Sequence, residues 1–417
     1  MSLHVLIVGG GIIGLCTAHF AAQRGHRVTL LERGPASRDG CSFGNGGMVV
    51  PSHFVPLAAP GMVRLGLKWM WNPESPFYIK PRLSWGLLDW GWKFTRAATA
   101  RHVNRSAPLL RDLHVASRAC FEELADETGN EFGLVKRGLL MLCKTRRAFD
   151  EEAHVAELGR RLGVPSEILT PSAISSLEPN LRMDVAGAVY FPDDCHLVPA
   201  ALMASLTRRL TEAGVQFAWN TVVTGWRTGG NLIHAVRTTG GDFDADEYVV
   251  CGGAWSPALV RSLGLRLPMQ AGKGYSLTLP QPRRLPSVCA ILSEARVAVT
   301  PMGSTLRFAG TMEISGLNQE IHRRRVQGII KSVPQYFPEY QPADFLRIQP
   351  WCGLRPCSPD GLPYVGRFGR FANLSVASGH AMMGVSLGPV TGKLMAEMLS
   401  GEEPSLAIEQ LSPSRYN

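Results

Sequence analysis

The hydrophobic pattern at the start of the chain changes from strand-like to helical and back. Residues 3–8 form an apolar run of strand length, and a helical pattern follows from Ile12 to Arg24. Gly25 ends that helix, and residues 27–31 form a second apolar run. A strand, a tight turn, a helix and a second strand within ~30 residues are typical of a βαβ unit.

The rest of the chain contains a mainly helical part and several sheet-forming parts. Residues 61–129 predict mostly helix, and residues 132–143 predict paired strands that are interrupted at Gly138. The other predicted helices are 146–162, 199–213, 318–333 and 389–399, and the other predicted strands lie at 185–191, within 215–251, within 275–312 and at 374–377.

This order predicts two units that interleave along the chain. Residues 1–50, 199–267 and 351–417 carry the α/β pattern, and we expect them to form a nucleotide-binding domain of Rossmann type. Residues 51–198 and 268–350 carry more antiparallel sheet and are predicted to form a substrate domain. The fold class is therefore α/β with an added antiparallel β domain.

Composition limits the class of protein. The chain has 417 residues, of which 45% are hydrophobic, so it has enough apolar material for a large core. Its formal net charge of +9 suits an anionic substrate, an acidic membrane surface or simple solubility. The basic residues are too dispersed to predict a nucleic-acid partner.

Cysteine usage and hydropathy indicate the compartment. The nine cysteines include no CxxC pair, which argues against a structural zinc site or a disulfide framework. No secretory signal pattern and no apolar run of ~20 residues is present. We expect a cytoplasmic protein without a metal, either soluble or in peripheral contact with the inner face of the membrane.

The strongest motif lies between the first strand and the first helix. It is the GxGxxG sequence Gly9-Gly10-Gly11-Ile12-Ile13-Gly14. Gly9 permits the tight turn, Gly11 allows a pyrophosphate to approach, and Gly14 lets the helix pack closely on the strand. Glu32 ends the second strand, where its carboxylate is suited to bind both ribose hydroxyls and to repel a 2′-phosphate. The motif therefore predicts FAD or NAD rather than NADP.

Two further segments favour FAD. Residues 249–256 (Val-Val-Cys-Gly-Gly-Ala-Trp-Ser) are a strand that runs into two glycines and then a helix. Residues 378–388 (Ser-Gly-His-Ala-Met-Met-Gly-Val-Ser-Leu-Gly) are a second strand-to-helix turn, and the helix N-terminus there would stabilise a reduced flavin. No second GxGxxG occurs, so no separate nicotinamide site is predicted.

These segments give the chain a family resemblance. It resembles the D-amino acid oxidase superfamily of flavoproteins and, within it, the bacterial D-amino acid dehydrogenases. The resemblance rests on segments 8–14 with 32–33, 41–48 (Cys-Ser-Phe-Gly-Asn-Gly-Gly-Met), 251–256, 353–361 (Gly-Leu-Arg-Pro-Cys-Ser-Pro-Asp-Gly) and 378–388. Residues 51–61 and 68–70 are similar to the dehydrogenase branch, and residues 72–80 are similar to relatives that oxidise D-hydroxyproline.

The resemblance implies a fold like that of p-hydroxybenzoate hydroxylase, with FAD extended between the first glycine turn and the C-terminal turn. Cys352 is out of register with the covalent attachment cysteine of sarcosine oxidases, so we expect non-covalent FAD. Ala381 departs from the glycine that dehydrogenases often carry after the histidine. The implied FAD-binding residues are Gly9, Gly11, Ile12, Ile13, Gly14, Glu32, Arg33, Ser42, Gly46, Gly47, Met48, Val223 (through its backbone), Gly252, Gly253, Trp255, Gly379, His380, Met382, Met383, Gly384 and Val385.

Three residues are candidates for the chemistry. Arg355 is the main one, since the family places its carboxylate-binding arginine in Gly-Leu-Arg-Pro and a guanidinium holds a carboxylate by two parallel bonds. The alternative is an ion pair between Arg355 and Asp360. Tyr275 is suited to bind the carboxylate or close the pocket, or else is a packed strand residue. His53 is suited to accept the amine proton or to contact the flavin, or else is a hydrogen-bonded loop residue.

The resemblance implies a dehydrogenase that moves a hydride from Cα of a D-amino acid to flavin N5. D-Proline and hydroxy-D-proline are expected among the substrates, with a quinone-type electron acceptor. The alternatives are an oxygen-using oxidase of glycine, sarcosine or another secondary amine, and a non-catalytic or RNA-modification-associated flavoprotein. Five of the nine tryptophans lie in residues 69–92, which indicates either domain packing or a membrane or quinone surface. The apolar residues of 83–94 occupy nearly all sides of a helix and favour packing.

Overall fold

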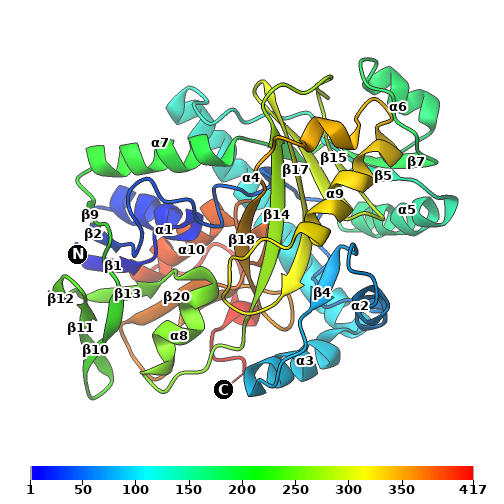
Figure 1. Ribbon diagram of the computed structural model, residues 1–417. Helices are drawn as coiled ribbons and strands as arrows, with labels where there is room; N and C mark the ends of the chain where they lie inside the picture. Colours follow the sequence, from blue (N-terminus) through cyan, green and yellow to red (C-terminus); the bar gives the residue numbers. More distant parts are fainter. Residues whose placement is uncertain (1, 417) are drawn as a thin grey trace.

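The first of two large sheets is built around the N-terminal strand. The computed structural model describes residues 2–416 (Figure 1). This sheet has the order β19-β20-β13-β1-β2-β9, and all pairs are parallel except β19 with β20. Its strands are β1 (His4–Val8), β2 (Arg27–Leu31), β9 (Gln216–Ala218), β13 (Glu247–Val250), β19 (Tyr364–Arg367) and β20 (Leu374–Ser378).

Both faces of this sheet are buried, which explains why its strands are continuous apolar runs. Val5 and Ile7 belong to the core under the helices, whereas Leu6 and Val8 face a second cluster. The small antiparallel sheet of β10 (Val223–Gly229), β11 (Leu232–Thr238) and β12 (Gly241–Phe243) contributes to that second cluster.

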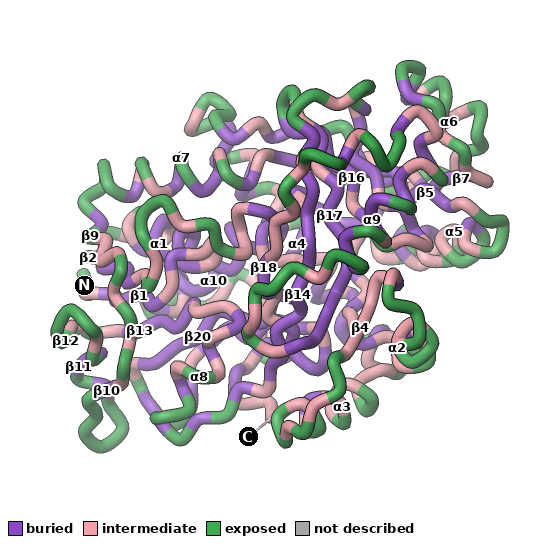
Figure 2. The backbone as a smooth tube through the Cα atoms, viewed as in Figure 1, coloured by how far each residue is buried: buried purple, intermediate pink, exposed green. Residues whose placement is uncertain are grey.

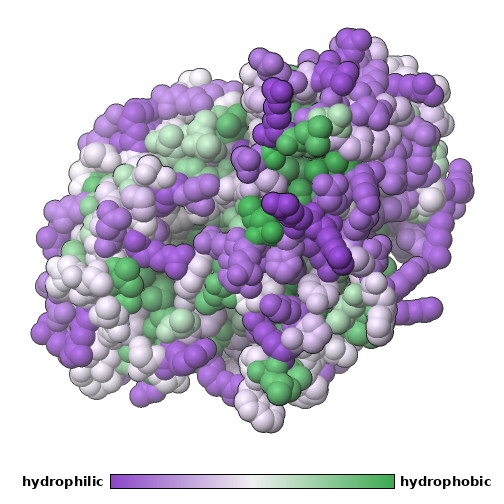
Figure 3. Space-filling view, viewed as in Figure 1, coloured by the Kyte–Doolittle hydropathy of each residue, from purple (hydrophilic) through white to green (hydrophobic). Residues whose placement is uncertain are grey.

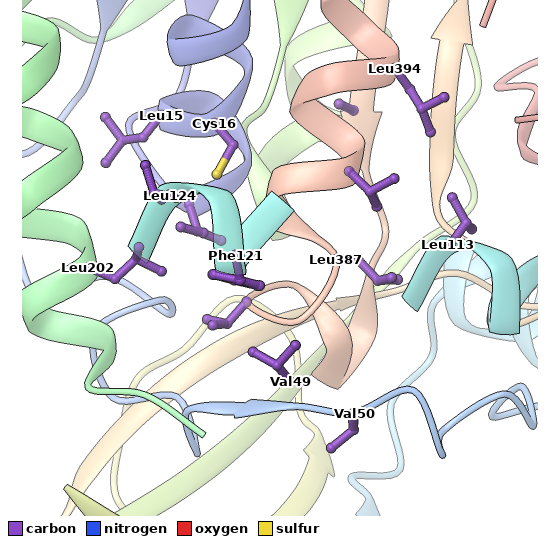
Figure 4. Close-up of a cluster of buried hydrophobic side chains, with 14 of the residues drawn as sticks. Leu15, Cys16, Val49, Val50, Leu113, Phe121, Leu124, Leu202, Leu387 and Leu394 are labelled. Atoms are coloured by element: carbon purple, nitrogen blue, oxygen red, sulfur yellow. The ribbon is translucent and has the colours of Figure 1, made fainter. Parts of the chain in front are cut away.

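Four helices lie together on the first face. Helix α1 (Ile12–Gln23) contacts both α7 (Pro199–Glu212) and α10 (Gly388–Leu399), and α10 contacts the long α4 (Ala100–Thr128). Figure 4 shows the apolar side chains that join them, among them Leu15, Phe121 and Leu202. The short α8 (Ser256–Arg261) lies near β20 in Figure 1.

The second large sheet has nine strands and is mainly antiparallel. Its order is β18-β14-β17-β16-β15-β5-β7-β6, and β4 pairs with β17. Figure 2 shows that its long strands β14 and β17 are buried along most of their length. The strands are β4 (Phe77–Ile79), β5 (Leu139–Cys143), β6 (Glu167–Leu169), β7 (Gly187–Phe191), β14 (Gln270–Leu279), β15 (Cys289–Leu292), β16 (Val297–Met302), β17 (Thr305–Ile314) and β18 (Trp351–Cys357).

Helix α9 (Arg323–Tyr336) supplies Val326, Ile329 and Val333 to a core on one face of the second sheet. The other helices of this part are α2 (Met62–Met70), α3 (Trp85–Ala97), α5 (Arg146–Arg161) and α6 (Pro171–Leu177). The short pair β3 (Met48–Val49) and β8 (Cys195–His196) lies outside both large sheets.

Three details of the predicted elements are wrong. Residues 132–143 do not form two strands that pair with each other: only β5 is a strand, because Gly138 has φ +73° and Val135 bridges to His196 instead. The helix predicted from residue 318 begins at Arg323, because the preceding segment bonds to Lys273 through the Asn318 side chain and the Glu320 carbonyl.

The third detail concerns residues 351–357, which we expected in the nucleotide-binding unit. Strand β18 instead pairs along β14 in the second sheet, with Gln270 opposite Cys357. The division of the remaining residues into two units stays a prediction.

Helix α3 also differs from the expectation of burial. Trp90 is buried, but Trp85 and Trp92 are 87% and 58% exposed. The apolar residues of this helix therefore serve two surfaces, one facing the protein and one facing solvent. Figure 3 shows apolar side chains at the lower edge of the molecule, where α3 lies.

Candidate active site

Three parallel strands end at the same edge of the first sheet. Strands β1, β13 and β20 are neighbours, and glycines follow them at Gly9, Gly252 and Gly379. The crevice outside the carboxyl ends of such strands is where open α/β sheets bind ligands. The three glycine segments that the sequence singled out therefore meet at one place.

The first glycine turn has the geometry that its motif predicts. Gly9 has φ +117°, and a Cβ there would lie 2.4 Å from the Cys251 carbonyl oxygen. A Cβ at Gly14 would lie 1.9 Å from the Gly9 carbonyl oxygen, so helix and turn are in close contact. At Gly11 the nearest such neighbour is Ser42 Oγ at 3.6 Å, so open space lies beside this residue. That space is where the motif expects a pyrophosphate.

Two helix N-termini meet beside this turn. A Cβ at Gly388 would lie 2.8 Å from Ile12 Cγ1, and one at Gly392 would lie 2.4 Å from the backbone carbon of Cys16. These matched contacts show that α1 and α10 run parallel and start together. Neither N-terminus is capped by its own preceding side chain. Their partial positive charges suit an anionic group such as a diphosphate.

Ser42 and Glu32 line the turn from either side. Ser42 Oγ accepts the Ile12 N–H at 3.0 Å, and Glu32 accepts the N–H groups of Gly10 at 2.7 Å and Gly34 at 2.9 Å. A carboxylate has about four acceptor positions, so Glu32 keeps capacity for ribose hydroxyls. Arg38, which the sequence reasoning missed, donates to the Gly10 carbonyl through Nε and Nη2.

The second and third glycine segments contact each other and the end of β2. The Arg33 guanidinium lies 3.6 Å from the centre of the Trp255 ring. Ser378 Oγ donates to the Gly253 carbonyl at 3.1 Å. Val223 begins β10, two residues after Thr221, whose N–H donates to the Glu32 carbonyl. These contacts are consistent with one extended site along the sheet edge.

The loop of residues 41–48 joins the two sheets. Arg307 donates to the carbonyls of Phe43 and Asn45, and Thr300 Oγ1 donates to that of Gly46 at 2.6 Å. Gly47 has φ +69°, and Met48 pairs with His196. The loop that carries the predicted cofactor residues Ser42, Gly46, Gly47 and Met48 is thus fixed on the second sheet.

Arg355 projects from β18 over the backbone of its neighbour strand. A Cβ at Gly274 would lie 2.2 Å from the guanidinium carbon, so a larger residue at this position would displace the guanidinium. Arg355 Nη1 donates to the Thr311 carbonyl, and burial lowers the pKa of the guanidinium. Among the ion pairs of residues 2–416 none involves Arg355, and Asp360 pairs with Arg415 at 2.8 Å instead. The alternative of an Arg355–Asp360 ion pair is therefore wrong.

A β-bulge lies beside the Thr311 carbonyl that accepts the hydrogen bond from Arg355. The β14–β17 register shifts between Lys273 and Tyr275, and Thr311 on the facing strand has φ +67°. Such a backbone conformation is strained for a β-branched residue, and bulges often redirect groups at functional sites. Thr311 carries no sequence signal, because a threonine within a strand is ordinary.

Tyr275 does not lie beside Arg355. Successive strand residues point to opposite faces, and Arg355 lies over Gly274. Tyr275 belongs to the core under α9, is 1% exposed, and donates its hydroxyl to Glu313 Oε2 at 2.9 Å. The expectation that Tyr275 binds the substrate carboxylate is therefore wrong, and Tyr275 is a packed strand residue.

His53 lies in a segment that is bound to the C-terminal turn. The Val50 N–H donates to Ser386 Oγ at 3.0 Å, and the His53 N–H donates to the Val50 carbonyl. The ring Nδ1 lies 2.9 Å from Ser52 Oγ. Burial lowers the pKa of His53 to about 4, so its imidazole is neutral at physiological pH.

The C-terminal turn has a strained residue and a buried histidine. Ala381 has φ +47°, a backbone conformation that glycine adopts more readily than alanine. His380 is buried, with Nε2 3.0 Å from Thr391 Oγ1 and Nδ1 without a partner within residues 2–416. Met382 and Met383 are partly buried, and Val385 is buried under α10 and its neighbours.

His114 and Ser386 are site residues that the sequence reasoning missed. His114 is fully buried in α4, and its Nδ1 lies 3.0 Å from Ser386 Oγ. Since these residues are distant in sequence, only the packing of α4 on α10 reveals their contact. The orphaned nitrogens of His114 and His380 are polar atoms that a ligand at the turn would satisfy.

Comparison with known proteins identifies a family. The profile of the family described as DAO, FAD dependent oxidoreductase, matches residues 4–398. A D-amino acid dehydrogenase of Granulibacter bethesdensis is 32% identical over 99% of this chain and 100% of that protein. A D-amino acid dehydrogenase of Methylobacterium radiotolerans is 34% identical over 99% of this chain and 100% of that protein.

Solved structures share the fold. Glycine oxidase from Geobacillus kaustophilus has a TM-score of 0.80 and 25% identity, and the match covers 100% of this chain and 99% of that chain. L-Proline dehydrogenase from P. horikoshii has a TM-score of 0.76 and 18% identity over 100% and 98% of the two chains. The second likeness shows the fold alone.

Proposed function

Because the chain belongs to the DAO family of FAD-dependent oxidoreductases, we propose that it is a D-amino acid dehydrogenase. Two of its relatives at 32% and 34% identity carry that name. The cofactor is FAD, and the paired helix N-termini, the open space beside Gly11 and the Glu32 carboxylate suit its diphosphate and ribose.

Arg355 carries the proposal for the substrate class. Its guanidinium is held by one backbone carbonyl and has no carboxylate partner in residues 2–416. A partly buried guanidinium without a counter-charge is suited to a carboxylate ligand, since two parallel charge-assisted bonds both bind and orient it. An α-amino acid supplies such a carboxylate at a fixed distance from Cα–H.

Each protein group has a distinct part in the proposed reaction. Bound FAD would supply the acceptor for the hydride that leaves Cα, and the product is an imino acid. Arg355 holds the substrate carboxylate, while the neutral imidazole of His53 accepts a proton from the ammonium group. Buried groups around the C-terminal turn exclude water from this region.

Non-covalent binding of FAD is part of the proposal. Cys352 faces the same side of the sheet as Tyr275, opposite to Arg355, and its thiol lies 3.1 Å from the Gln319 carbonyl. Cys357 is fully buried, and burial raises its pKa to about 12, so its thiol is a poor nucleophile.

The exposed tryptophans support a quinone-type acceptor at a membrane. Trp71 and Trp85 are 91% and 87% exposed, and cations flank them. Trp90, which lies in helix α3 together with Trp85, donates its Nε1–H to the Cys357 carbonyl at 2.9 Å. Cys357 is two residues from Arg355. No helix within residues 2–416 is long and apolar enough to cross a bilayer. We propose peripheral contact through α2 and α3, with amino acid oxidation coupled to a lipid-soluble acceptor.

Side-chain preference is proposed from the sequence alone. Residues 72–80 are similar to relatives that act on D-hydroxyproline, so D-proline and hydroxy-D-proline are included among the substrates. The second candidate function is an oxygen-using oxidase of glycine or another small amine. The glycine oxidase likeness at 25% identity favours it, and stoichiometric peroxide under air would identify it.

The substitution Arg355→Lys tests the proposed site. A lysine keeps the charge but loses the bidentate geometry, so we expect kcat/KM for D-amino acids to fall about 10–100-fold. The corresponding amines without a carboxylate should be oxidised equally by both proteins. The exposed Arg347→Lys is the control and should change neither value. An equal loss for both substrate types, or none, would remove Arg355 from carboxylate binding.

A further inference from the structure

A buried carboxylate is connected to His53 through one hydroxyl. Asp194, between β7 and β8, is fully buried. Its Oδ1 accepts the Ser52 N–H at 3.0 Å, and its Oδ2 lies 2.5 Å from Ser52 Oγ. Ser52 Oγ also lies 2.9 Å from His53 Nδ1. The three side chains form a continuous chain of hydrogen bonds from carboxylate to imidazole.

The ionised carboxylate fixes the direction of every proton in this chain. Since Asp194 is then an acceptor only, Ser52 must donate its single hydroxyl proton to Oδ2. The Ser52 oxygen is left as an acceptor toward His53, so Nδ1 carries the ring proton. The other ring nitrogen, Nε2, then has a free lone pair.

Protonation of Asp194 reverses the donor and acceptor roles in these hydrogen bonds. The protonated carboxyl donates to Ser52 Oγ, and the hydroxyl proton of Ser52 turns toward Nδ1 of His53. That nitrogen becomes the acceptor, and Nε2 carries the ring proton instead. A neutral imidazole with a proton on Nε2 has no free lone pair at that position and does not accept a proton there.

The charged neighbours of the chain come from several elements. Asp194 faces the thiols of Cys195 and Cys289, the carboxylate of Asp193 and, from α4, Arg118. His53 faces Arg296, in the turn between β15 and β16, and His114 of α4. None of these groups forms a hydrogen bond to the Asp194 carboxylate within residues 2–416, so Ser52 is its partner there.

We propose that Asp194 and Ser52 are positioning residues that hold His53 in the Nδ1–H tautomer and thereby make Nε2 the proton acceptor for the substrate amine. The proposal rests on the proposed function, in which His53 takes that proton. It adds two residues that touch neither substrate nor cofactor and that act through the imidazole.

The hydrogen-bond series from Asp194 through Ser52 to His53 predicts a specific pH dependence. Burial raises the pKa of Asp194 to about 7, and burial lowers that of His53 to about 4. The active tautomer requires the ionised carboxylate, so kcat/KM should fall as pH decreases through about 7. His53 itself remains neutral across that range, so this acid limb belongs to Asp194.

The substitution Asp194→Asn removes the ionisable carboxyl group and fixes the direction of the hydrogen bonds. The amide oxygen keeps the bond from the Ser52 N–H, so the amide NH₂ faces Ser52 Oγ and donates to it. The variant is thus locked in the inactive arrangement at every pH. We expect kcat/KM at pH 8 to fall by ~10²-fold or more, without an acid limb near neutrality. Asp193→Asn is the matched control, since Asp193 is 42% exposed and pairs with Arg118.

A spectroscopic readout keeps the test independent of turnover. In FAD-loaded protein with ¹⁵N-labelled histidine, the His53 signals are identified by their loss in His53→Gln. Wild type at pH 8 should show an unprotonated Nε2, and Asp194→Asn a protonated one. If Asp194→Asn does not fold, Ser52→Ala should give a mixture of tautomers, and Ser52→Thr should restore the wild-type form.

The outcomes distinguish the two proposals. A protonated Nε2 in wild type at pH 8, or an unchanged tautomer in both Asp194→Asn and Ser52→Ala, would overturn the role of Asp194 and Ser52. Absence of turnover with every D-amino acid contradicts the proposed function instead, and the NMR spectra still decide the tautomer. An acid limb that Asp193→Asn abolishes and Asp194→Asn retains would also contradict the proposal.

Discussion

Several polar side chains of the candidate site are held by neutral partners rather than by opposite charges. Arg355 donates to the Thr311 carbonyl, and His114 and His380 contact the hydroxyls of Ser386 and Thr391. Such partners fix orientation without neutralising charge or blocking a ligand. An incoming carboxylate or cofactor therefore meets groups that are oriented but not fully satisfied.

His114 should make stability depend on pH. Burial lowers its folded-state pKa to about 3, against 6.5 when exposed, so the unfolded chain binds more protons between these values. Stability from His114 is present above pH 6.5 and is lost as pH falls toward 3. In His114→Gln, the slope of unfolding free energy between pH 5 and 6 should be smaller by about 1.4 kcal/mol per pH unit.

Urea unfolding of the FAD-loaded protein measures this slope. Asp194 acts in the opposite sense, because its folded-state pKa is raised to about 7 from 3.8, but it is present in both proteins. The exposed His154→Gln is the control and should retain the wild-type slope. Equal slopes for wild type and His114→Gln would show that His114 is not kept neutral by burial.

At the scale of elements, the close contact of α1 and α10 determines the site. Gly388 and Gly392 face Ile12 and Cys16 one helical turn apart, so the two helices approach closely and start together. This contact brings both N-termini to the edge where β1 and β20 end. Glycine within a helix is unfavourable by itself, so the packing compensates for its low propensity.

The substitution Gly392→Ala should separate these helices. Its Cβ would lie 2.4 Å from the Cys16 backbone, and overpacking of this kind destabilises by about 1–3 kcal/mol. The amount of FAD retained per protein after gel filtration should also fall, because the two N-termini that bind its diphosphate move apart. Gly91→Ala in α3 is the control: the added methyl group would meet no atom within 4 Å, and it should stabilise by up to about 1 kcal/mol. Full FAD retention in Gly392→Ala would contradict the role of this contact.

The elements that the sequence predicts best are those with strong local signals. Apolar runs flanked by glycines predict β1, α1, β2, β20 and α10 to within a few residues. The side of the sheet that Tyr275 faces is not predictable, because it depends on the register with β18. The contact of Ser52 with Asp194 is equally hidden, since β3 and β8 bring the two residues together from 142 positions apart.

At the scale of the whole molecule, exposed apolar side chains gather on α2, α3 and the segment between them. Leu67, Trp71, Leu83 and Trp85 are each at least 60% exposed. The exposed cations Arg64, Lys68 and Lys80 lie in the same part of the chain. Sequence patterning favours burial of α3, because an apolar helix surface looks the same whether protein or lipid covers it.

This surface should bind anionic membranes. We expect the FAD-loaded protein to co-sediment with vesicles that contain anionic phospholipid, and less with neutral vesicles, because tryptophan and basic residues together favour the charged interface. The double substitution Trp71→Ser with Trp85→Ser should reduce binding at least ~10-fold. Leu346→Ser, at a residue 82% exposed elsewhere on the molecule, is the control. Equal binding of wild type and the double variant would assign the membrane contact to another surface.

The proposed activity requires that this protein hold FAD and use it to oxidise D-amino acids bound through Arg355. Anaerobic mixing of the purified yellow protein with paired D- and L-amino acids, including proline, tests it directly by the loss of visible flavin absorption. We expect bleaching by one or more D-enantiomers, much slower bleaching by their L-counterparts, and recovery of the colour when a quinone is added. Flavin that stays oxidised with every D-amino acid, or that L-enantiomers bleach faster, would contradict it.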